Sequence, residues 1–327
     1  MHMSDALISP AVFAATSAIA LALVGIATRQ VSRTSRKRDL SSLTEQVSEQ
    51  RIVPLMGVMG ALIFAAQMLN FAIPATGSSG HIVGGILLAA ILGPWAGFLT
   101  LTSIIVIQCL LFADGGLMAL GCNILNMAAI SCLVAYPLVF KPLVYHRTSA
   151  LRWGIASISA SITALAMGAL AVTIETEMSE ITALPYARFI VFMIPIHLLI
   201  GLGEGLATAA VIAALRRYRP DLLHDAEYTE PKRRSIFFAA VIAIALIGGT
   251  VAGSIASSAP DGLEWSIERT TEGNQLAQYQ SAIHQETAET QQATALLPDY
   301  NTTLSGIVGI GATLVLIYAL SLLFRRR

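Results

Sequence analysis

Two histidines in this sequence have the position and surroundings to bind a metal ion. His2 follows the first residue directly, and His81 ends a loop, residues 74–81, whose glycines permit tight backbone turns. With a free amine on Met1, three nitrogens (the amine, the His2 amide and the His2 Nδ1) can close two adjacent chelate rings in nearly one plane. His81 can supply a fourth nitrogen and so complete the square that Ni(II) and Cu(II) prefer. We therefore predict a metal site formed by Met1, His2 and His81, with an affinity that rises with pH because binding releases protons.

A chance occurrence is the alternative for the same residues. A histidine after the first methionine is often accidental, and a single loop histidine does not make a site. The linear sequence does not show that residues 2 and 81 meet. From the residues alone, both interpretations stay open.

Polar side chains near the ends of the apolar segments could support such a site. A metal-bound imidazole is usually held from behind by a carboxylate, a carbonyl or another polar group. The candidates for this supporting role are Ser79, Gln67, Asn70, Asp114 and Asn123. Hydrogen bonding between membrane helices is the equal alternative for these side chains.

The composition indicates a membrane protein. Of the 327 residues, 55% are hydrophobic and only 12% are charged, with a mean hydropathy of +0.70, whereas a soluble domain carries about 25% charged residues. The formal net charge of zero argues against a nucleic-acid partner. A membrane span needs about 20 apolar residues, and we expect spans near residues 6–28, 53–73, 82–93, 95–113, 119–140, 151–173, 186–214, 235–258 and 304–324.

The predicted fold is therefore an all-α polytopic membrane protein with about seven core helices and two C-terminal transmembrane helices. One pair of core helices is short, because the apolar stretch 82–113 is too long for one straight span. The tripeptide at 93–95, Gly-Pro-Trp, interrupts it, since proline removes a backbone donor and clashes with the preceding turn.

The charge distribution predicts the orientation of the chain. Eighteen of the 20 Lys and Arg residues lie in the segments 29–51, 141–152, 215–234 and 325–327. With the spans above, all these segments lie on one side, which the positive-inside rule makes the cytoplasmic side. We therefore expect an external N-terminus, a cytoplasmic C-terminus, and His2 and His81 at the external face.

We expect the chain to divide into three parts. Residues 1–214 form the transmembrane core, residues 215–234 a charged cytoplasmic linker, and residues 235–327 a two-span module. The long external loop of that module, residues 259–303, is polar and lacks the apolar content for a core of its own. Its histidine, His284, is therefore expected to be solvated.

Two ionisable residues inside a predicted span offer a rival function. His197 and Glu204 are seven residues apart, on one helix face and about 10 Å apart along the axis, and ionisable groups in a membrane are functional candidates in coupling or catalysis. The neighbouring glycines 201, 203 and 205 favour close helix packing instead. An intramembrane enzyme would need a nucleophile or a complete metal triad at the same depth, and none is found. A passive metal channel would need polar residues throughout the membrane, whereas here they gather near the external end.

Other chemistry is not supported by motifs. The sequence has no GxxxxGK[ST] motif for ATP binding and no HExxH or GxSxG motif. Active transport would therefore draw its energy from another subunit or from an ion gradient. The three cysteines, Cys109, Cys122 and Cys132, form no CxxC pair and lie in apolar stretches, so we expect buried small hydrophobes.

Most of the first 214 residues resemble the CbiM/NikM family, and the remainder resembles a PDGLE, NikN-like module that some members carry fused behind the core. The module is indicated by SSAPDGLEW at 257–265. The core is indicated by MHMSDALISPAV at 1–12, PLMGVMGALIFAAQMLNF at 54–71, GSSGHIVGGILLAAILGPWAG at 77–97, FADGGLMALGCNILNM at 112–127 and IHLLIGLGEGLATAA at 196–210.

Members of this family are the metal-binding membrane (S) components of energy-coupling-factor (ECF) transporters for cobalt and nickel. The resemblance implies a multi-pass protein of the prokaryotic cytoplasmic membrane that works with a transmembrane coupling (T) protein and cytoplasmic ABC ATPases. It also implies that the metal is held by the terminal amine of Met1, the amide and imidazole of His2, and the imidazole of His81.

The identity of the metal depends on two short motifs. The cobalt-type pattern is closer to SCSH in the loop and to HGGL further on, whereas this chain has SSGH at 78–81 and DGGL at 114–117. The difference favours Ni(II) as the transported ion. Co(II) is the alternative, because a planar set of four nitrogens accepts it too.

Overall fold

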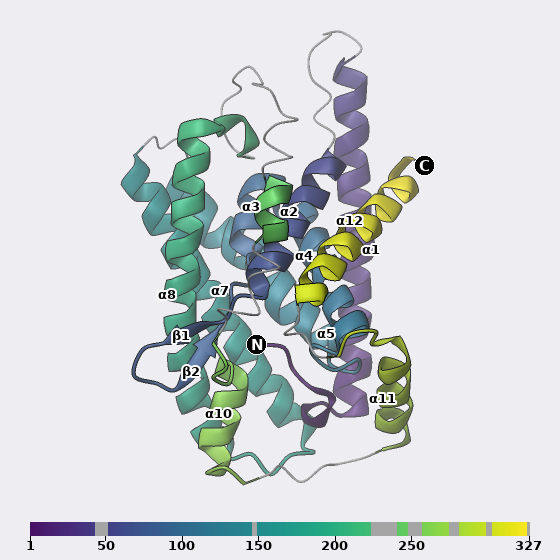
Figure 1. Ribbon diagram of the computed structural model, residues 1–327, viewed down its shortest axis with the longest axis vertical. Coiled ribbons are helices and arrows are strands. Elements are labelled where there is room, and N and C mark those ends of the chain that lie inside the picture. Colours follow the sequence, from purple (N-terminus) through teal and green to yellow (C-terminus); the bar gives the residue numbers. More distant parts are fainter. Residues whose placement is uncertain are drawn as a thin grey trace.

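Helices form nearly all of the regular structure (Figure 1). The computed structural model describes residues 1–42, 52–145, 149–223, 241–247, 257–274, 281–298 and 303–325. Within those ranges, five segments are long and apolar enough to cross a membrane: residues Pro10–Arg33 of α1 (Pro10–Ser42), α4 (Pro94–Phe112), the helix Leu120–Val144, α7 (Ala150–Ser179) and α8 (Tyr186–Tyr218). The prediction of an all-α polytopic membrane protein is confirmed.

Two shorter apolar helices pack against each other beside these spans. They are α2 (Ile52–Gln67) and the stretch Leu304–Leu320 of α12 (Thr303–Arg325). The approach is close, because a Cβ added to Gly309 would overlap the ring of Phe64. The expected span 235–258 is described only at residues 241–247, which are helical, and at residues 257–258, which are not. Most of the charged linker lies outside the described residues.

The predicted break in the apolar stretch 82–113 is present. Helix α3 (Gly85–Leu92) ends at Gly93, whose φ is +83°, and α4 starts at once with Pro94 in its first turn. A proline there lacks only a donor that the helix would leave unpaired anyway. Helix α3 is buried along its whole length, because it packs against α4 and the helix Leu120–Val144.

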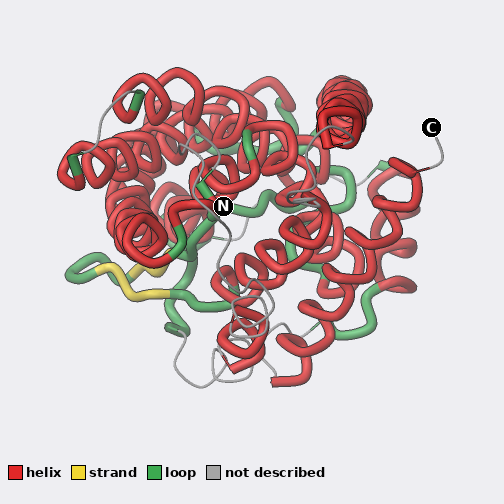
Figure 2. The backbone as a smooth tube through the Cα atoms, turned by 90° about the horizontal axis from the view of Figure 1, so that it is seen from above, coloured by secondary structure: helices red, strands yellow, loops and turns green. Residues whose placement is uncertain are grey.

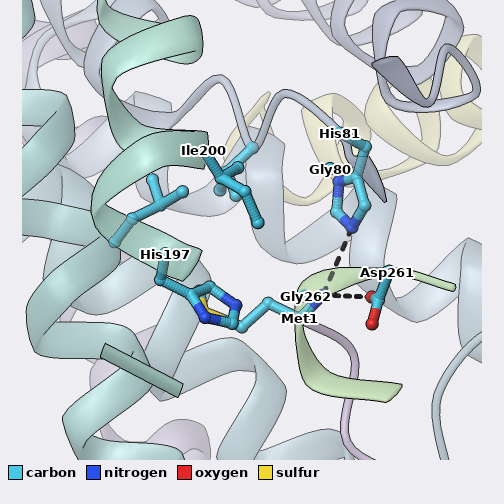
Figure 3. A pocket seen from close by; sticks show the side chains of 9 residues that line it. Met1, Gly80, His81, His197, Ile200, Asp261 and Gly262 are labelled. Carbon is cyan, nitrogen blue, oxygen red and sulfur yellow. Dashed lines mark hydrogen bonds and ion pairs between the residues drawn. The ribbon is translucent and has the colours of Figure 1, made fainter. Parts of the chain in front are cut away.

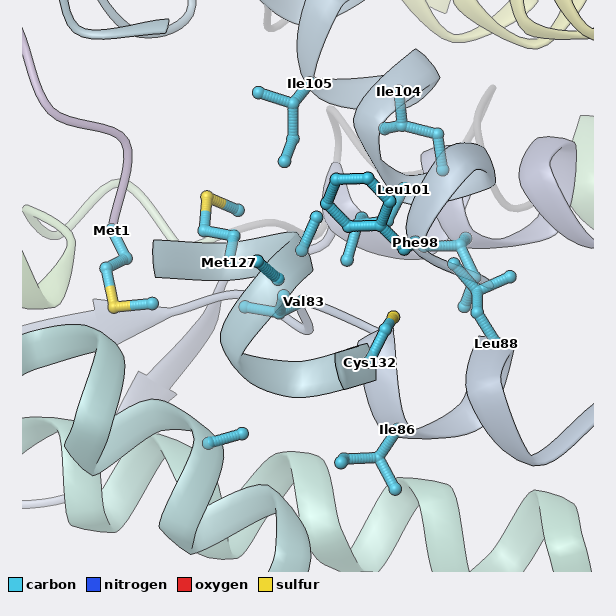
Figure 4. Close-up of a cluster of buried hydrophobic side chains, with 14 of the residues drawn as sticks. Met1, Val83, Ile86, Leu88, Phe98, Leu101, Ile104, Ile105, Met127 and Cys132 are labelled. Carbon is cyan, nitrogen blue, oxygen red and sulfur yellow. The ribbon is translucent and has the colours of Figure 1, made fainter. Parts of the chain in front are cut away.

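The core of the protein surrounds α3. Side chains of α3, α4 and the following helix interlock there, and Figure 4 shows Leu88, Phe98, Leu101 and Met127 among them. The helix Leu120–Val144 consists of α5 (Leu120–Asn123), a π-helical stretch (Ile124–Phe140) and α6 (Lys141–Val144). The three cysteines are buried and free, as predicted.

The N-terminal segment runs into the middle of the helices instead of joining the first span. Only a 3₁₀ turn, Asp5–Leu7, precedes α1, which starts at Pro10 rather than near residue 6. Figures 1 and 2 both place the N-terminus among the helices. The cause is a set of main-chain contacts at Met3: its N–H donates to Asn123 Oδ1 (2.8 Å), and its carbonyl accepts from Gly116 N–H (2.8 Å).

A small β-hairpin, which the sequence reading did not anticipate, carries the loop that leads to His81. Strands β1 (Phe71–Ile73) and β2 (Ser78–Gly80) are antiparallel, with Phe71 opposite Gly80. The turn between them uses positive φ values at Ala75 (+64°) and Gly77 (+75°). A Cβ on Gly80 would lie 2.6 Å from the Ile200 side chain, so the glycine lets β2 approach α8.

The expectation that His284 is solvated is wrong, and the described part of the loop 259–303 contains two helices. Residues there form α10 (Gly262–Thr271) and α11 (Ala282–Thr294), which lie at the lower end of the molecule in Figure 1. His284 is only 8% exposed, and its Nε2 lies 3.1 Å from the Ile8 carbonyl. The segment has little apolar content, but its polar groups pair with main-chain groups of the core, as Gln291 Nε2 does with the Gly115 carbonyl (2.7 Å).

Candidate metal site

The terminal amine of Met1 and the His81 ring lie side by side. The amine nitrogen is 3.4 Å from His81 Nε2, and both residues are buried (Figure 3). On its other side the amine donates to Asp261 Oδ2 at 2.6 Å. The structure therefore brings together two groups that are 80 residues apart in the sequence and were predicted to meet.

His2 completes the group. Its ring stacks on that of His81, with centroids 5.3 Å apart and planes at 20°. Its Nε2 lies 3.2 Å from Gln108 Oε1, and its Nδ1 lies 3.3 Å from Asp114 Oδ1. All three predicted ligand residues therefore lie together, and the Asp114 carboxyl group lies beside the His2 ring.

A chain of hydrogen bonds determines which nitrogen of His2 carries the proton. It starts at the carbonyl of Val83, which can only accept, and which receives a hydrogen bond from Gln67 Nε2 (2.8 Å). Gln67 must then present Oε1 to Gln108 Nε2 (2.7 Å), which leaves Gln108 Oε1 as the acceptor facing His2 Nε2. His2 therefore holds its proton on Nε2 and has a lone pair on Nδ1. That is the form that a chelate through Nδ1 requires.

The imidazoles are neutral in this environment. Burial, followed by the nearby terminal ammonium, lowers the pKa of both His2 and His81 to about 3. The contact between His2 Nδ1 and Asp114 is consequently not an ion pair. Burial also raises the pKa of Asp114, which favours a protonated carboxyl that can donate to the lone pair of His2 Nδ1, 3.3 Å from Asp114 Oδ1.

The donor set differs from a conventional side-chain cluster. Within the described residues, no three His, Cys, Asp or Glu side chains converge on one metal position, so four nitrogens are available only if main-chain atoms take part. With bonds of about 2.0–2.1 Å, neighbouring nitrogens of a square lie about 2.9 Å apart. The amine and His81 Nε2, at 3.4 Å, would have to close by about 0.5 Å, which a small rotation of either group supplies.

The remaining predicted residues lie around this centre at different distances. Asn123 holds Met3 through both its side-chain atoms. Ser79 lies on β2, where its N–H and hydroxyl donate to the carbonyls of Pro260 (2.8 Å) and Ala259 (2.7 Å). Asn70 offers its main-chain carbonyl to Ser257 N–H (2.8 Å). Ser79 and Asn70 therefore bind the C-terminal module and not an imidazole.

His197 and Glu204 have separate roles on α8. Both Glu204 oxygens accept main-chain N–H groups, from Val83 (2.9 Å) and Gly84 (3.1 Å), so this carboxylate fixes the segment that follows His81. His197 bonds through Nδ1 to the Met193 carbonyl (2.8 Å). Its ring lines a small cavity beside Met1 and His81 (Figure 3). The two side chains form no common catalytic arrangement.

Two residues of the site were missed by the sequence reading. Gln108 lies inside an apolar span, and a buried amide at such a position was a signal for a hydrogen-bond role. Asp261 belongs to the segment Asp261–Glu264, whose D-x-x-E pattern is typical of a helix N-terminus. The pattern indicated where a helix starts, but not that the same carboxylate reaches Met1.

The fold and the site define a class: a multi-pass helical membrane protein with a buried cluster of nitrogen groups, from Met1, His2 and His81, among its helices. The chain belongs to the family of the cobalt uptake substrate-specific transmembrane region, CbiM, whose model matches residues 2–222. A PDGLE domain matches residues 235–326. It is thus a member of a nickel and cobalt transport family and not an enzyme.

Relatives carry either metal in their names. The chain is 32% identical over 281 residues to a protein of Archaeoglobus fulgidus named as a fused nickel transport protein, NikMN, covering 83% of this chain and 87% of that one. It is 28% identical over 284 residues to the fused nickel transport protein NikMN of Rhodobacter capsulatus, covering 83% and 77%. A cobalt transport protein CbiM of Sorangium cellulosum is 29% identical over 227 residues, covering 68% and 94%.

A solved structure supports the arrangement of the core. The crystal structure of a truncated transition metal transporter superposes with a TM-score of 0.54 at 28% identity. It covers 67% of this chain and 99% of the other.

Proposed function

We propose that this protein is the substrate-binding membrane component of an ECF-type ABC importer and that its ion is Ni(II). The proposal rests on one observation: the Met1 amine and the His2 ring both contact the buried His81 ring. The ion would bind to the amine, the His2 amide, His2 Nδ1 and His81 Nε2. The lone pair that the glutamine chain leaves on His2 Nδ1 supports this ligand set.

Nickel is favoured over cobalt by the SSGH and DGGL motifs and by the NikMN relatives. Affinity alone does not decide between the two ions, because nitrogen sites in general bind Ni(II) more tightly than Co(II). Competition between labelled Ni(II) and Co(II) for uptake in cells decides it. The proposal expects that excess Co(II) reduces nickel uptake less than an equal excess of unlabelled Ni(II) does.

The partners and the orientation are part of the proposal. The charge distribution supports an external N-terminus and a cytoplasmic C-terminus in a prokaryotic cytoplasmic membrane. The ion would then be captured outside, and a transmembrane coupling protein with cytoplasmic ABC ATPases would drive its delivery. Uptake in cells should require those subunits as well as this chain.

Calorimetric titration with Ni(II) tests the ligand set. Replacing His81 by Ala opens one corner of the square to water, so the affinity should fall at least about tenfold, which is 1.4 kcal/mol. Adding one residue before Met1 removes the amine from its place and should abolish binding.

The extended protein has a built-in control. Removing the added residue with a site-specific protease should restore the affinity, and intact mass should show that Met1 is retained. An extended protein that binds Ni(II) as tightly as the native one would rule out the amine as a ligand.

A further inference from the structure

The carboxylate of Asp261 is the strongest contact of the terminal amine. Its Oδ2 lies 2.6 Å from the Met1 nitrogen, and the two side chains are 19% and 4% exposed. The C-terminal module therefore places a negative charge directly on a proposed metal ligand.

Asp261 is held rigidly by its own helix. Its Oδ1 accepts from the N–H groups of Leu263 (2.9 Å) and Glu264 (3.0 Å), and Glu264 Oε2 lies 3.4 Å from the Asp261 N–H. This capping box at the start of α10 uses one carboxylate oxygen and leaves the other for the Met1 amine. The orientation of the carboxylate thus follows from the helix and does not depend on Met1.

The same hairpin positions both neighbours of the amine. Strand β2 binds the segment before α10 through Ser79, whose N–H donates to Pro260, and it continues directly into His81. Trp265 Nε1 donates to the Thr76 carbonyl (3.0 Å) at the hairpin turn. A Cβ on Gly262 would lie 2.7 Å from Ile200, so α10 also packs tightly on α8.

We infer that Asp261 is a positioning residue that holds the Met1 amine in place for the metal, so that the C-terminal module completes the site without supplying a ligand. The inference rests on the proposed function. An amine bound to a metal through its lone pair keeps two N–H groups, and one of them can still donate to Asp261. The contact therefore persists when the ion binds. In the ion-free protein it already limits the conformations of Met1, so less conformational entropy is lost on binding.

The substitution Asp261→Asn isolates this role. Asparagine caps a helix as well as aspartate does, so α10 should remain, while the charge facing the amine is lost. In the full-length protein, Ni(II) affinity should fall about five- to thirtyfold, the factor that corresponds to ordering one backbone residue. The absorption spectrum of the nickel-saturated variant should match the wild type, because the four nitrogen ligands are unchanged.

Two variants serve as controls. Glu264→Gln alters the same capping box but no group that touches Met1, so its affinity should equal that of the wild type. Asp261→Glu restores a carboxylate and should recover part of the affinity. Thermal unfolding of all three shows whether the helix is preserved.

The outcomes separate this inference from the proposed function. An affinity that is unchanged or higher in Asp261→Asn, while His81→Ala binds weakly, overturns the positioning role and leaves the ligand set standing. A changed nickel spectrum in Asp261→Asn would make Asp261 a ligand and overturn it as well. If His81→Ala binds as tightly as the wild type, the proposed function itself fails.

Discussion

Replacing Gln108 by Leu should weaken nickel binding through His2. In the metal-bound site, His2 Nδ1 faces the ion and its Nε2–H needs an acceptor, which is Gln108 Oε1 at 3.2 Å. Leucine removes that acceptor, and because Gln108 is fully buried, water does not replace it. The ion-free protein can move the proton to Nδ1, beside Asp114, so the penalty falls on the bound state.

The size of the effect follows from two independent estimates. Losing a group that supports a metal-bound histidine costs about 10- to 100-fold in affinity. Leaving one buried donor without an acceptor costs about 1–3 kcal/mol, and 100-fold corresponds to about 2.7 kcal/mol. We therefore expect a 10- to 100-fold weaker Kd for Ni(II) in calorimetric titration.

Gln67→Leu is the matched control. It breaks the same chain one step further away, and Gln108 can still turn an oxygen toward His2. If both orientations of its amide become equally populated, the competent half of the molecules gives an apparent Kd only about twofold weaker. Equal losses in the two variants, or an unchanged affinity in Gln108→Leu, would refute the assignment of the His2 proton.

Three further predictions concern protons, the segment after His81, and the C-terminal module. Because the imidazole pKa values lie near 3, the rise of Ni(II) affinity from pH 5 to pH 8 should come from the amine and amide alone. The slope of log Kd against pH should therefore be the same in His81→Ala as in the wild type; a slope smaller by one proton would contradict this. Glu204→Gln replaces one of two charge-assisted acceptors and should lower the free energy of unfolding by about 1.5–3 kcal/mol, as thermal unfolding in detergent can measure; an unchanged melting temperature would contradict it. Truncation after Glu230 should leave a folded protein that binds one ion, more weakly, while uptake in cells with all partner subunits drops sharply; full uptake would refute a role of the module in metal loading.

Features set by covalent chemistry or by a short chelate could be predicted from the sequence. The break between α3 and α4 follows from Gly93, which adopts a φ of +83°, and from Pro94 directly after it, which fits the first turn of a new helix. The grouping of Met1 and His2 also needs only neighbouring residues. Their meeting with His81 required the fold, and only the structure shows it.

Features that depend on docking of a polar segment could not be predicted. Residues 259–303 have too little apolar content to indicate a packed structure, and yet His284 is buried beneath Ile8. The interactions are hydrogen bonds to main-chain groups, as at Ser79 and Gln291. Main-chain partners leave no trace in side-chain patterns, so the contact of Asp261 with the amine was not foreseeable either.

The contact between Met1 and Asp261 joins two residues that the ribosome adds to the chain some 260 residues apart. At about 5–20 residues per second, this interval lasts about 13–50 s. The terminal amine is therefore without its final partner through most of synthesis, and during this time it is open to modifying enzymes. Completion of the binding site is a late event in the maturation of the chain, and premature termination anywhere before α10 yields a protein whose first residue is never fully fixed.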